Sequence, residues 1–577
     1  MRFRYYLLFV LIAGLSVAAY VGVSALGSPA GFPLDDAWIH QTYARSFATT
    51  GQFAFAPGQP SAGSTSPLWT LLIAVGYRLN VDYRLWTYTL GALSLALCAW
   101  LASRLSLRLW PDRRGLAGAV GLLCLFEWHL VWAAASGMET VLFAALALAV
   151  MERTARPGLR RRDGLMSGVL GGLLTATRPE GLLLVALAGV VAMARRATGD
   201  TRHSEPCPEP FAFAQGKLRR RGSEESAFRA GEMLRCPFAA LRASAQHDRR
   251  ARFMLALCAG FAVSVLPAAW LNLRASGTPF PNTFYAKQQE YAVYFSSLAA
   301  WLPRAIEVLG APFVGAQFLL LPGFLAEALA SLRRLRDRST WVDMLPIAWV
   351  AAHLGVYLLR LPVAYQHGRY MIPVIPIVIL YGVHGTARIL ERLKPRFRSD
   401  DSLAPVAQRS GVSRPNKPAT QVATTNPFRD LLRLARPMWT GSVIAATAAF
   451  WLVGAGAYRV DVNIIENELV ASARWIEANT PPGALVAAHD IGAIGYFSRR
   501  PLLDLAGLIS PEVIPILRDE EALLALLRMR EADFVAAPPN FYSPALLDAP
   551  ELEPAFSGDS PFTPKHWLIF RARWGRP

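Results

Sequence analysis

Residues 5–46 read YYLLFVLIAGLSVAAYVGVSALGSPAGFPLDDAWIHQTYARS, and this stretch decides the class of the protein. Up to about residue 27 it is an apolar run of roughly 20 residues, long enough for a helix to cross a bilayer. A signal peptide also has a basic start and small residues near its end, but its apolar core is shorter, so we interpret the run as a retained first span. Two adjacent carboxylates, a histidine and a tyrosine follow it directly.

The composition extends this interpretation to the whole chain. Of the 577 residues, 53% are hydrophobic and only 17% are charged. The five cysteines show no CxxC spacing, so neither a disulfide framework nor a zinc site is predicted. Candidate spans lie near 5–27, 84–107, 115–135, 139–152, 164–176, 181–194, 253–274, 305–330, 342–360, 370–391 and 438–459. The sequence therefore predicts a polytopic α-helical membrane protein with about eleven transmembrane helices.

The basic residues predict the orientation of these spans. A net charge of +18 would by itself suggest nucleic acid as a partner, but the Lys and Arg residues cluster in alternate loops between apolar segments. With the N-terminus inside, about 37 of them fall inside and about six fall in the outer loops before residue 370, which is the asymmetry of a membrane topology. The short apolar segment 66–79 is predicted to lie at the interface. A twelfth span there would place the basic segment RLWPDRR outside, against the charge count.

The same pattern divides the chain into domains. Residues 1–459 are predicted to form the transmembrane bundle, with a first outer loop at 28–83. Within it, the inside segments 199–250 and 399–428 lack apolar periodicity and are predicted to be disordered. After the last span, the strand-like runs ALVAAHD, PLLDLAG, ADFVAAPP and HWLIFRARW alternate with helix-like segments. Residues 461–577 are therefore predicted to form a small extracytoplasmic α/β domain.

The acid pair at the start of the first outer loop is the strongest candidate site. If a helix begins near Ala37, then Asp36, His40 and Tyr43 share one face of it. Asp35 is turned away from them by about 100°. One aspartate could simply cap the helix, but a cap does not account for both. Two carboxylates beside apolar surface repel each other, which raises the pKa of one and suits it to act as a general base.

Other candidates lie at outer helix ends and in outer loops. Ionisable groups at such depth are costly unless paired or hydrated, so they mark either a functional site or a structural ion pair, here Arg178 with Glu139 or Glu180. Cations near the outer surface are not needed for topology, and they suit a phosphate group. The candidates are Glu139 in SGMET, Arg178 and Glu180 in TRPEG, Asn282, Tyr285 and Lys287 in PNTFYAK, His367 and Arg369 in YQHGRYM, and His489 and Asp490 in AHDIG. For the last two, hydrogen bonding within the loop is the alternative.

Taken together, these segments resemble a known family. The likeness rests on DDAWIHQTYARSFATTGQFAFAPGQPSAGSTSPLW, GMET, TRPEG, PNTFYAK, RYMIPVIP and DIGAIGYFSRRPLLDLAGL. They are similar to bacterial integral-membrane glycosyltransferases of the C-type (GT-C) fold, and most similar to the branch that contains the mycobacterial terminal arabinofuranosyltransferases. The likeness covers most of the chain except the two inside segments 199–250 and 399–428.

The resemblance implies a function and roles for several residues. It implies a polyprenyl-phosphate-linked sugar as donor and a glycan, lipid or protein acceptor, on the outer face of the bacterial plasma membrane. An aspartate of the first loop is the expected catalytic base, Asp35 or Asp36, and Asp35 is preferred as the first of the pair. The residues expected to bind the lipid phosphate are Arg178, Lys287 and Arg369.

The resemblance leaves the need for a divalent metal open. Asp36 and His40 could supply two ligands, and no third is evident in the sequence. No other cofactor is expected.

Two other classes of protein are alternatives to a glycosyltransferase. A transporter or flippase of a lipid-linked glycan would carry ionisable residues near the middle of the bilayer and paired broken helices, whereas the charges here gather at outer ends. The broken hairpin at 164–194 is the one feature that favours it. A non-catalytic, glycan-binding membrane scaffold would not need the acid pair, which is intact.

Overall fold

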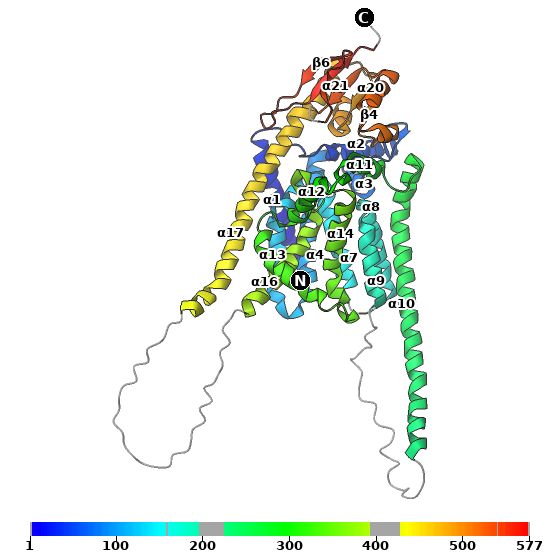
Figure 1. Ribbon diagram of the computed structural model, residues 1–577, viewed down its shortest axis with the longest axis vertical. Helices are drawn as coiled ribbons and strands as arrows, with labels where there is room; N and C mark the ends of the chain where they lie inside the picture. Colours follow the sequence, from blue (N-terminus) through cyan, green and yellow to red (C-terminus); the bar gives the residue numbers. More distant parts are fainter. Residues whose placement is uncertain are drawn as a thin grey trace, which may run out of the picture.

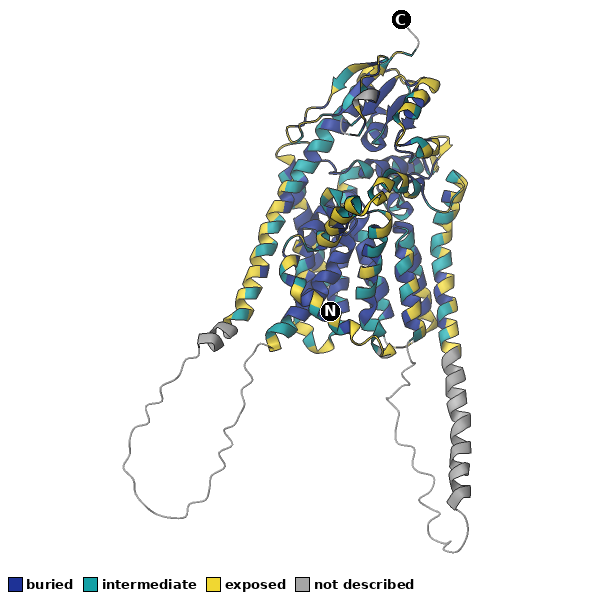
Figure 2. Ribbon diagram, viewed as in Figure 1, coloured by how far each residue is buried: buried dark blue, intermediate teal, exposed yellow. Residues whose placement is uncertain are grey.

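The structure is a computed structural model that describes residues 3–156, 158, 160–194, 224–392, 427–538 and 541–574. It consists of a helical bundle with a small sheet-containing domain at one end (Figure 1). The largest hydrophobic core runs through the bundle, and smaller cores lie within the C-terminal domain and where that domain meets the bundle. Figure 2 shows these buried residues in dark blue.

The bundle is built around one central helix, α4 (Tyr83–Leu109), which contacts α1, α5, α6, α7 and α16. A Cβ added at Gly91 would collide with the carbonyl group of Ala134, so glycine is what allows α4 and α6 to lie so close together. The first half of the bundle also contains α1 (Phe3–Ala25), α5 (Arg114–Phe126), α6 (Trp128–Ala135), α7 (Thr140–Thr154), α8 (Arg161–Thr177) and α9 (Gly181–Ala194). The second half contains α10 (Glu224–Ser276), α12 (Leu298–Gly310), α13 (Gln317–Leu332), α14 (Trp341–Arg360), α16 (Ile375–Arg392) and α17 (Pro427–Ile464). α18 (Ala471–Asn479) belongs to the C-terminal domain, where it packs against residues 494–498.

Every predicted span overlaps a helix, but fewer helices pass a test of length and apolarity. Among the described residues, six helices are long and apolar enough to cross a membrane, or eight if each of two bent pairs is one span. The predicted spans 139–152, 164–176 and 181–194 coincide with α7, α8 and α9, which have 15, 17 and 14 residues. The total of eleven therefore stays a prediction.

Two of the predicted spans are sharply bent, which the sequence did not predict. The axis turns by 52° between α5 and α6, where the Glu127 carboxylate caps α6 by accepting a hydrogen bond from the backbone N–H of Leu130. It turns by 98° between α12 and α13, where Gly315 has a φ of 125° that favours glycine. Hydropathy cannot detect either break, because the residues on both sides of each are apolar.

Two further predictions concern segments outside the spans. Segment 66–79 forms α3 (Pro67–Arg78), a helix of 12 residues that packs against α2 (Asp35–Thr50) and is about 18 Å long, shorter than a bilayer core. Within the segment 199–250 that is predicted to be disordered, residues 224–250 belong to α10, and this stretch is rich in the helix formers Ala, Arg, Leu and Glu. Residues 199–223 and 399–426 lie outside the described residues.

The C-terminal domain contains one five-stranded sheet. Its strands are β3 (Val486–Ala488), β4 (Leu502–Asp504), β5 (Phe534–Ala537), β6 (Leu552–Ser557) and β7 (Leu568–Ala572), in the order β4-β3-β5-β7-β6. β3 is parallel to β4 and β5, whereas β7 is antiparallel to β5 and β6. The four predicted strand-like runs contain β3, β4, β5 and β7. The edge strand β6 was not predicted, because it contains Pro554 and proline argues against a strand except at an edge.

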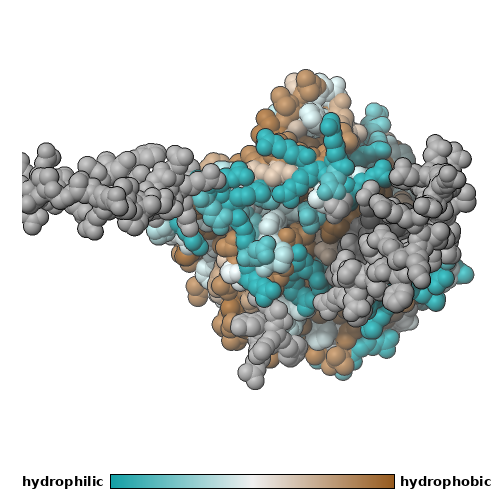
Figure 3. All heavy atoms as spheres, turned by 90° about the horizontal axis from the view of Figure 1, so that it is seen from below, coloured by the Kyte–Doolittle hydropathy of each residue, from teal (hydrophilic) through white to brown (hydrophobic). Residues whose placement is uncertain are grey.

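The two ends of the bundle differ. The N-terminus and the ends of α9 and α16 lie at the end farthest from the C-terminal domain (Figure 1). Figure 3 views the molecule from that end and shows hydrophilic residues gathered there. α2, α3 and α11 (Asn282–Glu290) lie at the other end, between the bundle and the C-terminal domain. The first outer loop is therefore enclosed between the two domains.

Candidate functional site

A cavity of about 290 Å³ lies where the first loop, the turn between α8 and α9, α11 and α14 meet. Part of its wall is apolar and is formed by Leu182, Leu183, Phe280, Phe284, Val356 and Leu361. The charged part is formed by Asp36, Arg178, Glu180, Lys287, Arg360 and Arg369. A wall of this kind suits a ligand with an apolar portion and an anionic group.

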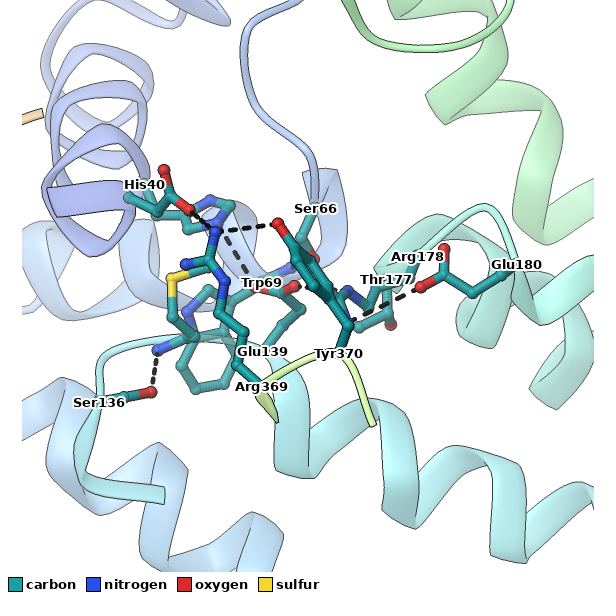
Figure 4. Close-up of polar contacts among 12 residues, drawn as sticks. His40, Ser66, Trp69, Ser136, Glu139, Thr177, Arg178, Glu180, Arg369 and Tyr370 are labelled. Carbon is teal, nitrogen blue, oxygen red and sulfur yellow. Dashed lines mark hydrogen bonds and ion pairs between the residues drawn. The ribbon is translucent and has the colours of Figure 1, made fainter. Parts of the chain in front are cut away.

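Three of the cations surround one aromatic ring, that of Tyr370. The guanidinium carbons of Arg178 and Arg369 lie 5.1 and 4.9 Å from the ring centroid, and Lys287 Nζ lies 5.3 Å from it. Lys287 Nζ and Arg369 Nη2 also donate hydrogen bonds to Tyr370 Oη, at 2.6 and 2.9 Å. An aromatic face attracts cations, so Tyr370 offsets part of their mutual repulsion. We call Arg178, Lys287 and Arg369 the cation cluster; Figure 4 shows Arg178 and Arg369 beside Tyr370.

Arg369 retains unused hydrogen-bond donors. Its Nη2 lies 2.5 Å from Asp36 Oδ2, but its buried Nε and Nη1 make no hydrogen bond to any described residue. A buried donor without a partner costs free energy. An anion that accepts a hydrogen bond from either of these donors would remove this cost.

Arg178 is fixed by carboxylates. Its Nε lies 3.0 Å from Glu139 Oε1 and its Nη1 lies 3.7 Å from Glu180 Oε1, so both ion pairs that the sequence offered as alternatives form. Glu180 also accepts a hydrogen bond of 2.5 Å from Tyr357 Oη. Glu139 is fully buried, and its second oxygen lies 3.4 Å from His40 Nε2 (Figure 4). These contacts hold the Arg178 side chain in the cavity wall.

The two adjacent aspartates have different partners. α2 begins at Asp35 and its N-cap residue is Leu34, so the interpretation of either aspartate as the cap is wrong. The Asp35 carboxylate instead accepts hydrogen bonds from the backbone N–H groups of Gly492 and Ala493, each 2.7 Å long. Asp36 lines the cavity and pairs with the cation cluster. One acid thus joins α2 to the C-terminal domain, and the other faces the cavity.

Their surroundings shift the pKa values of the two carboxyl groups in opposite directions. Burial raises the pKa of Asp35 well above its usual value, and the nearby Asp490 raises it further. Burial would also raise the pKa of Asp36, but Arg369 and Lys287 outweigh burial and hold it below the usual range. Asp36 is therefore an anion at neutral pH in this arrangement.

Two predicted site residues, Tyr43 and Asn282, do not line the large cavity but form hydrogen bonds between segments around it. Tyr43 Oη accepts a hydrogen bond of 2.9 Å from the backbone N–H of Gly63 within the first loop. Asn282 Nδ2 donates one of 3.1 Å to the carbonyl oxygen of Leu508 in the C-terminal domain. Both side chains stabilise the walls around the cavity.

The remaining predicted residues do not line the cavity. His367 Nε2 lies 2.8 Å from Asp461 Oδ2 on α17. His489 and Asp490 are hydrogen-bonded to each other at 2.9 Å, as the alternative of loop hydrogen bonding predicted. Tyr285 packs against the ring of Phe284.

Some residues that line the cavity were not predicted from the sequence. Tyr370 and Thr283 stand inside the quoted segments RYM and PNTFYAK, next to predicted residues, and could have been found there. Tyr357 and Arg360 lie at the end of a predicted span, where the sequence gives no sign of their role.

The residues considered as metal ligands have other partners. Asp36 pairs with Arg369, while His40 Nδ1 is hydrogen-bonded to Thr70 Oγ1 at 3.1 Å. In the described part of the chain, no three His, Cys, Asp or Glu side chains are grouped so that they could hold a metal ion.

Solved structures share the fold of this protein over nearly its whole length. ArnT from Cupriavidus metallidurans, bound to undecaprenyl phosphate, matches with a TM-score of 0.52 and 14% identity over 99% of this chain and 98% of ArnT. The archaeal oligosaccharyltransferase AglB from Archaeoglobus fulgidus, in complex with an inhibitory peptide and a dolichol-phosphate, matches with a TM-score of 0.52 and 10% identity over 99% of this chain and 75% of AglB. The chain has the GT-C fold. The fold family that the sequence predicted is thus confirmed.

Other comparisons add less about this GT-C chain. The mycobacterial arabinofuranosyltransferase AftD matches at 15% identity over 100% of this chain and 42% of AftD, but the TM-score of 0.44 is too low to carry an argument, so the predicted likeness to that branch stays a prediction. Residues 457–574 match a family model described as a domain of unknown function, DUF8728. None of the curated proteins matches the chain in sequence.

Proposed function

We propose that the protein is a glycosyltransferase that moves a sugar from a polyprenyl-phosphate donor to a glycan, lipid or protein acceptor at the outer face of the bacterial plasma membrane. One observation carries the proposal. The cation cluster, with unused buried donors on Arg369, stands beside an apolar wall in the same cavity.

The donor fits this cavity in two parts. Its phosphate binds Arg369 and Lys287, which offer a planar pair of donors and a compact ammonium group. Its polyprenyl chain lies against the apolar wall and the neighbouring lipid. The structural neighbours support this class of ligand, because ArnT was solved with undecaprenyl phosphate and AglB with a dolichol-phosphate.

We assign the general base to Asp36 rather than to Asp35. The sequence favoured Asp35, but both of its carboxylate oxygens accept hydrogen bonds from the C-terminal domain. Asp36 faces the cavity and is charged, so it can accept a proton from an acceptor bound there.

Binding of the donor also prepares this base. Before the donor binds, Arg369 and Lys287 hold the pKa of Asp36 low, and a carboxylate with such a low pKa is a weak base. The donor phosphate competes with Asp36 for the same two cations and brings negative charge near it. Both effects raise the pKa of Asp36, so the base becomes effective when the donor is in place.

In the reaction, the acceptor oxygen forms a bond to the anomeric carbon of the sugar, and the bond from that carbon to the phosphate oxygen breaks. The electron pair of the broken bond leaves with the polyprenyl phosphate, and the acceptor proton passes to Asp36. The cation cluster stabilises the charge that develops on the phosphate, which is usually the largest single contribution to catalysis. Proton transfer to a positioned base contributes about 10²–10⁴ in rate.

The orientation agrees with a lipid-linked donor. The predicted topology places the basic segments inside, whereas α2 and α11, which line the cavity, lie at the other end of the bundle, beneath the C-terminal domain (Figure 1). Nucleotide sugars are made inside the cell, so an enzyme that works outside needs a sugar carried across the membrane on a lipid.

The test uses the full chain purified in detergent and a panel of undecaprenyl-phosphate-linked sugars, arabinofuranose and several hexoses. Release of undecaprenyl phosphate and transfer of the sugar to a cell-envelope extract are measured, with Asp36→Asn as the control. Turnover of at least one donor, strongly reduced in the control, is expected. The proposal fails if no donor is turned over and surface glycans, measured by mass spectrometry, are unchanged in cells that lack the protein.

A further inference from the structure

A second, much smaller cavity lies beside Asp36, on the side of the C-terminal domain. Its polar lining consists of Asp36, His40, Thr65, Thr283 and Lys287, and Leu508 of the C-terminal domain contributes to its wall. We call it the small chamber. Asp36, Thr283 and Lys287 also line the large cavity, so the two spaces adjoin.

The size of the small chamber limits what it can hold. Its volume of about 10 Å³ corresponds to one water molecule. A water in such a site needs two to four polar partners, and the lining supplies at least that many. A single hydroxyl group has the same size and the same hydrogen-bonding capacity.

The Thr283 hydroxyl group is available to hydrogen-bond a polar group in the small chamber. Thr283 is only 3% exposed, and its Oγ1 makes no hydrogen bond to any described residue. A buried hydroxyl without a partner costs about 1–3 kcal/mol. An oxygen-bearing group in the chamber removes this cost, and it lies within the space that Asp36 lines.

Leu508 is held in place from two sides. It follows β4, where the fully buried Asp504 carboxylate accepts hydrogen bonds from the backbone N–H groups of Ala506 and Ile509, at 2.8 and 2.7 Å. From the bundle side, Asn282 Nδ2 donates a hydrogen bond to the Leu508 carbonyl oxygen. The C-terminal domain therefore supplies a fixed wall of the chamber.

We infer that the small chamber binds the attacking hydroxyl group of the acceptor, and that Leu508 limits the size of the group that carries this hydroxyl. The inference rests on the proposed function and adds to it a place for the acceptor. It gives the C-terminal domain a direct part in acceptor selection. Thr283 orients the hydroxyl oxygen while Asp36 receives its proton.

Three variants test the inference, with the donor that the panel of undecaprenyl-phosphate sugars identifies. Leu508→Phe fills the small chamber, and Leu508→Ala enlarges it. Thr283→Val removes the unpartnered hydroxyl group, and valine has nearly the same shape as threonine. Leu508 is partly exposed and so tolerates substitution. Met529→Phe, at a residue 70% exposed in the same domain, is the matched control for added bulk. The KM for the acceptor, the KM for the donor and the share of donor hydrolysed by water are measured.

The Leu508→Phe variant is expected to change the KM for the acceptor but not the KM for the donor. Leu508→Phe raises the KM for the acceptor at least tenfold and leaves the KM for the donor within twofold. Leu508→Ala increases the share of donor lost to hydrolysis at least threefold, because water enters the enlarged chamber. Thr283→Val lowers kcat/KM for the acceptor about fivefold, as expected for one hydrogen bond between uncharged groups.

The outcomes distinguish the failure of this inference from that of the proposed function. If wild type and Met529→Phe turn over donor but the Leu508 and Thr283 variants match them, the chamber is only a site for structural water and the inference is wrong. The inference is equally wrong if the KM values for donor and acceptor change together. If the wild-type protein turns over no donor, both the proposed function and the inference are wrong.

Discussion

Replacement of Asp36 by Asn is expected to impair catalysis and to tighten the binding of the lipid phosphate. The asparagine side chain has the same shape, so the cavity stays intact, but it cannot take a proton from the acceptor. It also no longer competes as an anion for Arg369, whose Nη2 lies 2.5 Å from the native carboxylate. An enzyme variant that binds better and reacts more slowly is an uncommon combination.

Both effects have an expected size. Loss of a general base costs about 10²–10⁴ in kcat, which is about 3–5 kcal/mol in the barrier. A hydrogen bond to a charged group is worth about 1.5–3 kcal/mol, and part of it is now available to the ligand phosphate. Undecaprenyl phosphate should therefore bind roughly tenfold more tightly, which corresponds to about 1.4 kcal/mol.

Asp35→Asn is the matched comparison, because it makes the same chemical change one residue away. The amide oxygen can replace only one of the two carboxylate oxygens, so the N–H group of either Gly492 or Ala493 loses its acceptor. This weakens the junction of the two domains by about 1–3 kcal/mol. Thermal stability should fall, while kcat at low temperature should stay within about tenfold of wild type.

The assay measures release of undecaprenyl phosphate from the donor, and the affinity for undecaprenyl phosphate alone is measured by calorimetry in detergent. The reasoning is refuted if Asp36→Asn keeps kcat within threefold of wild type while Asp35→Asn loses more than a hundredfold. It is also refuted if Asp36→Asn weakens the binding of undecaprenyl phosphate, since that would mean that Asp36 assists the cations instead of competing with the ligand.

Three further predictions follow from the same geometry. Arg369→Lys keeps the charge but loses the planar pair of donors, so the affinity for undecaprenyl phosphate should fall about tenfold, whereas an unchanged affinity in calorimetry would contradict the role of Arg369. Gly492→Ala places a Cβ against the backbone carbonyl of Asp35, so the domain junction must shift and the unfolding temperature should drop by several degrees; an equally stable variant would contradict the tight junction. Because the pKa of Asp36 is lowered, its carboxylate stays charged as the pH falls through the usual carboxylate range near 4. The kcat/KM should therefore stay flat from pH 8 to about pH 5. An acid limb well above pH 5, together with a loss of kcat of more than a hundredfold in Asp35→Asn, would instead identify Asp35, whose pKa is raised, as the base.

The sequence predicted those features that depend on local pattern. Apolar runs located the helices of the bundle, and the helix assumed to begin near Ala37 is α2, which begins at Asp35. The family resemblance implied that Arg178, Lys287 and Arg369 bind one lipid phosphate, and all three line the same cavity. The inferences about helices use residues close together in the chain, where helix geometry and membrane depth fix the outcome.

The features that were missed depend on contacts between distant segments. The different partners of Asp35 and Asp36 arise because the segment at 492–493 docks on α2, more than 450 residues along the chain. The bend before α13 depends on Gly315, which lies inside an apolar stretch. Tyr357 reaches the cavity from the end of a span, where hydropathy does not distinguish a lining residue from a lipid-facing one.

The hydrogen bonds from Gly492 and Ala493 to Asp35 have a consequence for how this protein can change in evolution. Asp35 joins α2 to the C-terminal domain and its neighbour Asp36 is the proposed base, with a single peptide bond between them. An insertion or deletion at that bond would rotate one acid away from its partner by about 100°. The domain and the bundle must therefore be inherited together, and exchanging either one for that of a relative should succeed only where the matching loop is exchanged with it.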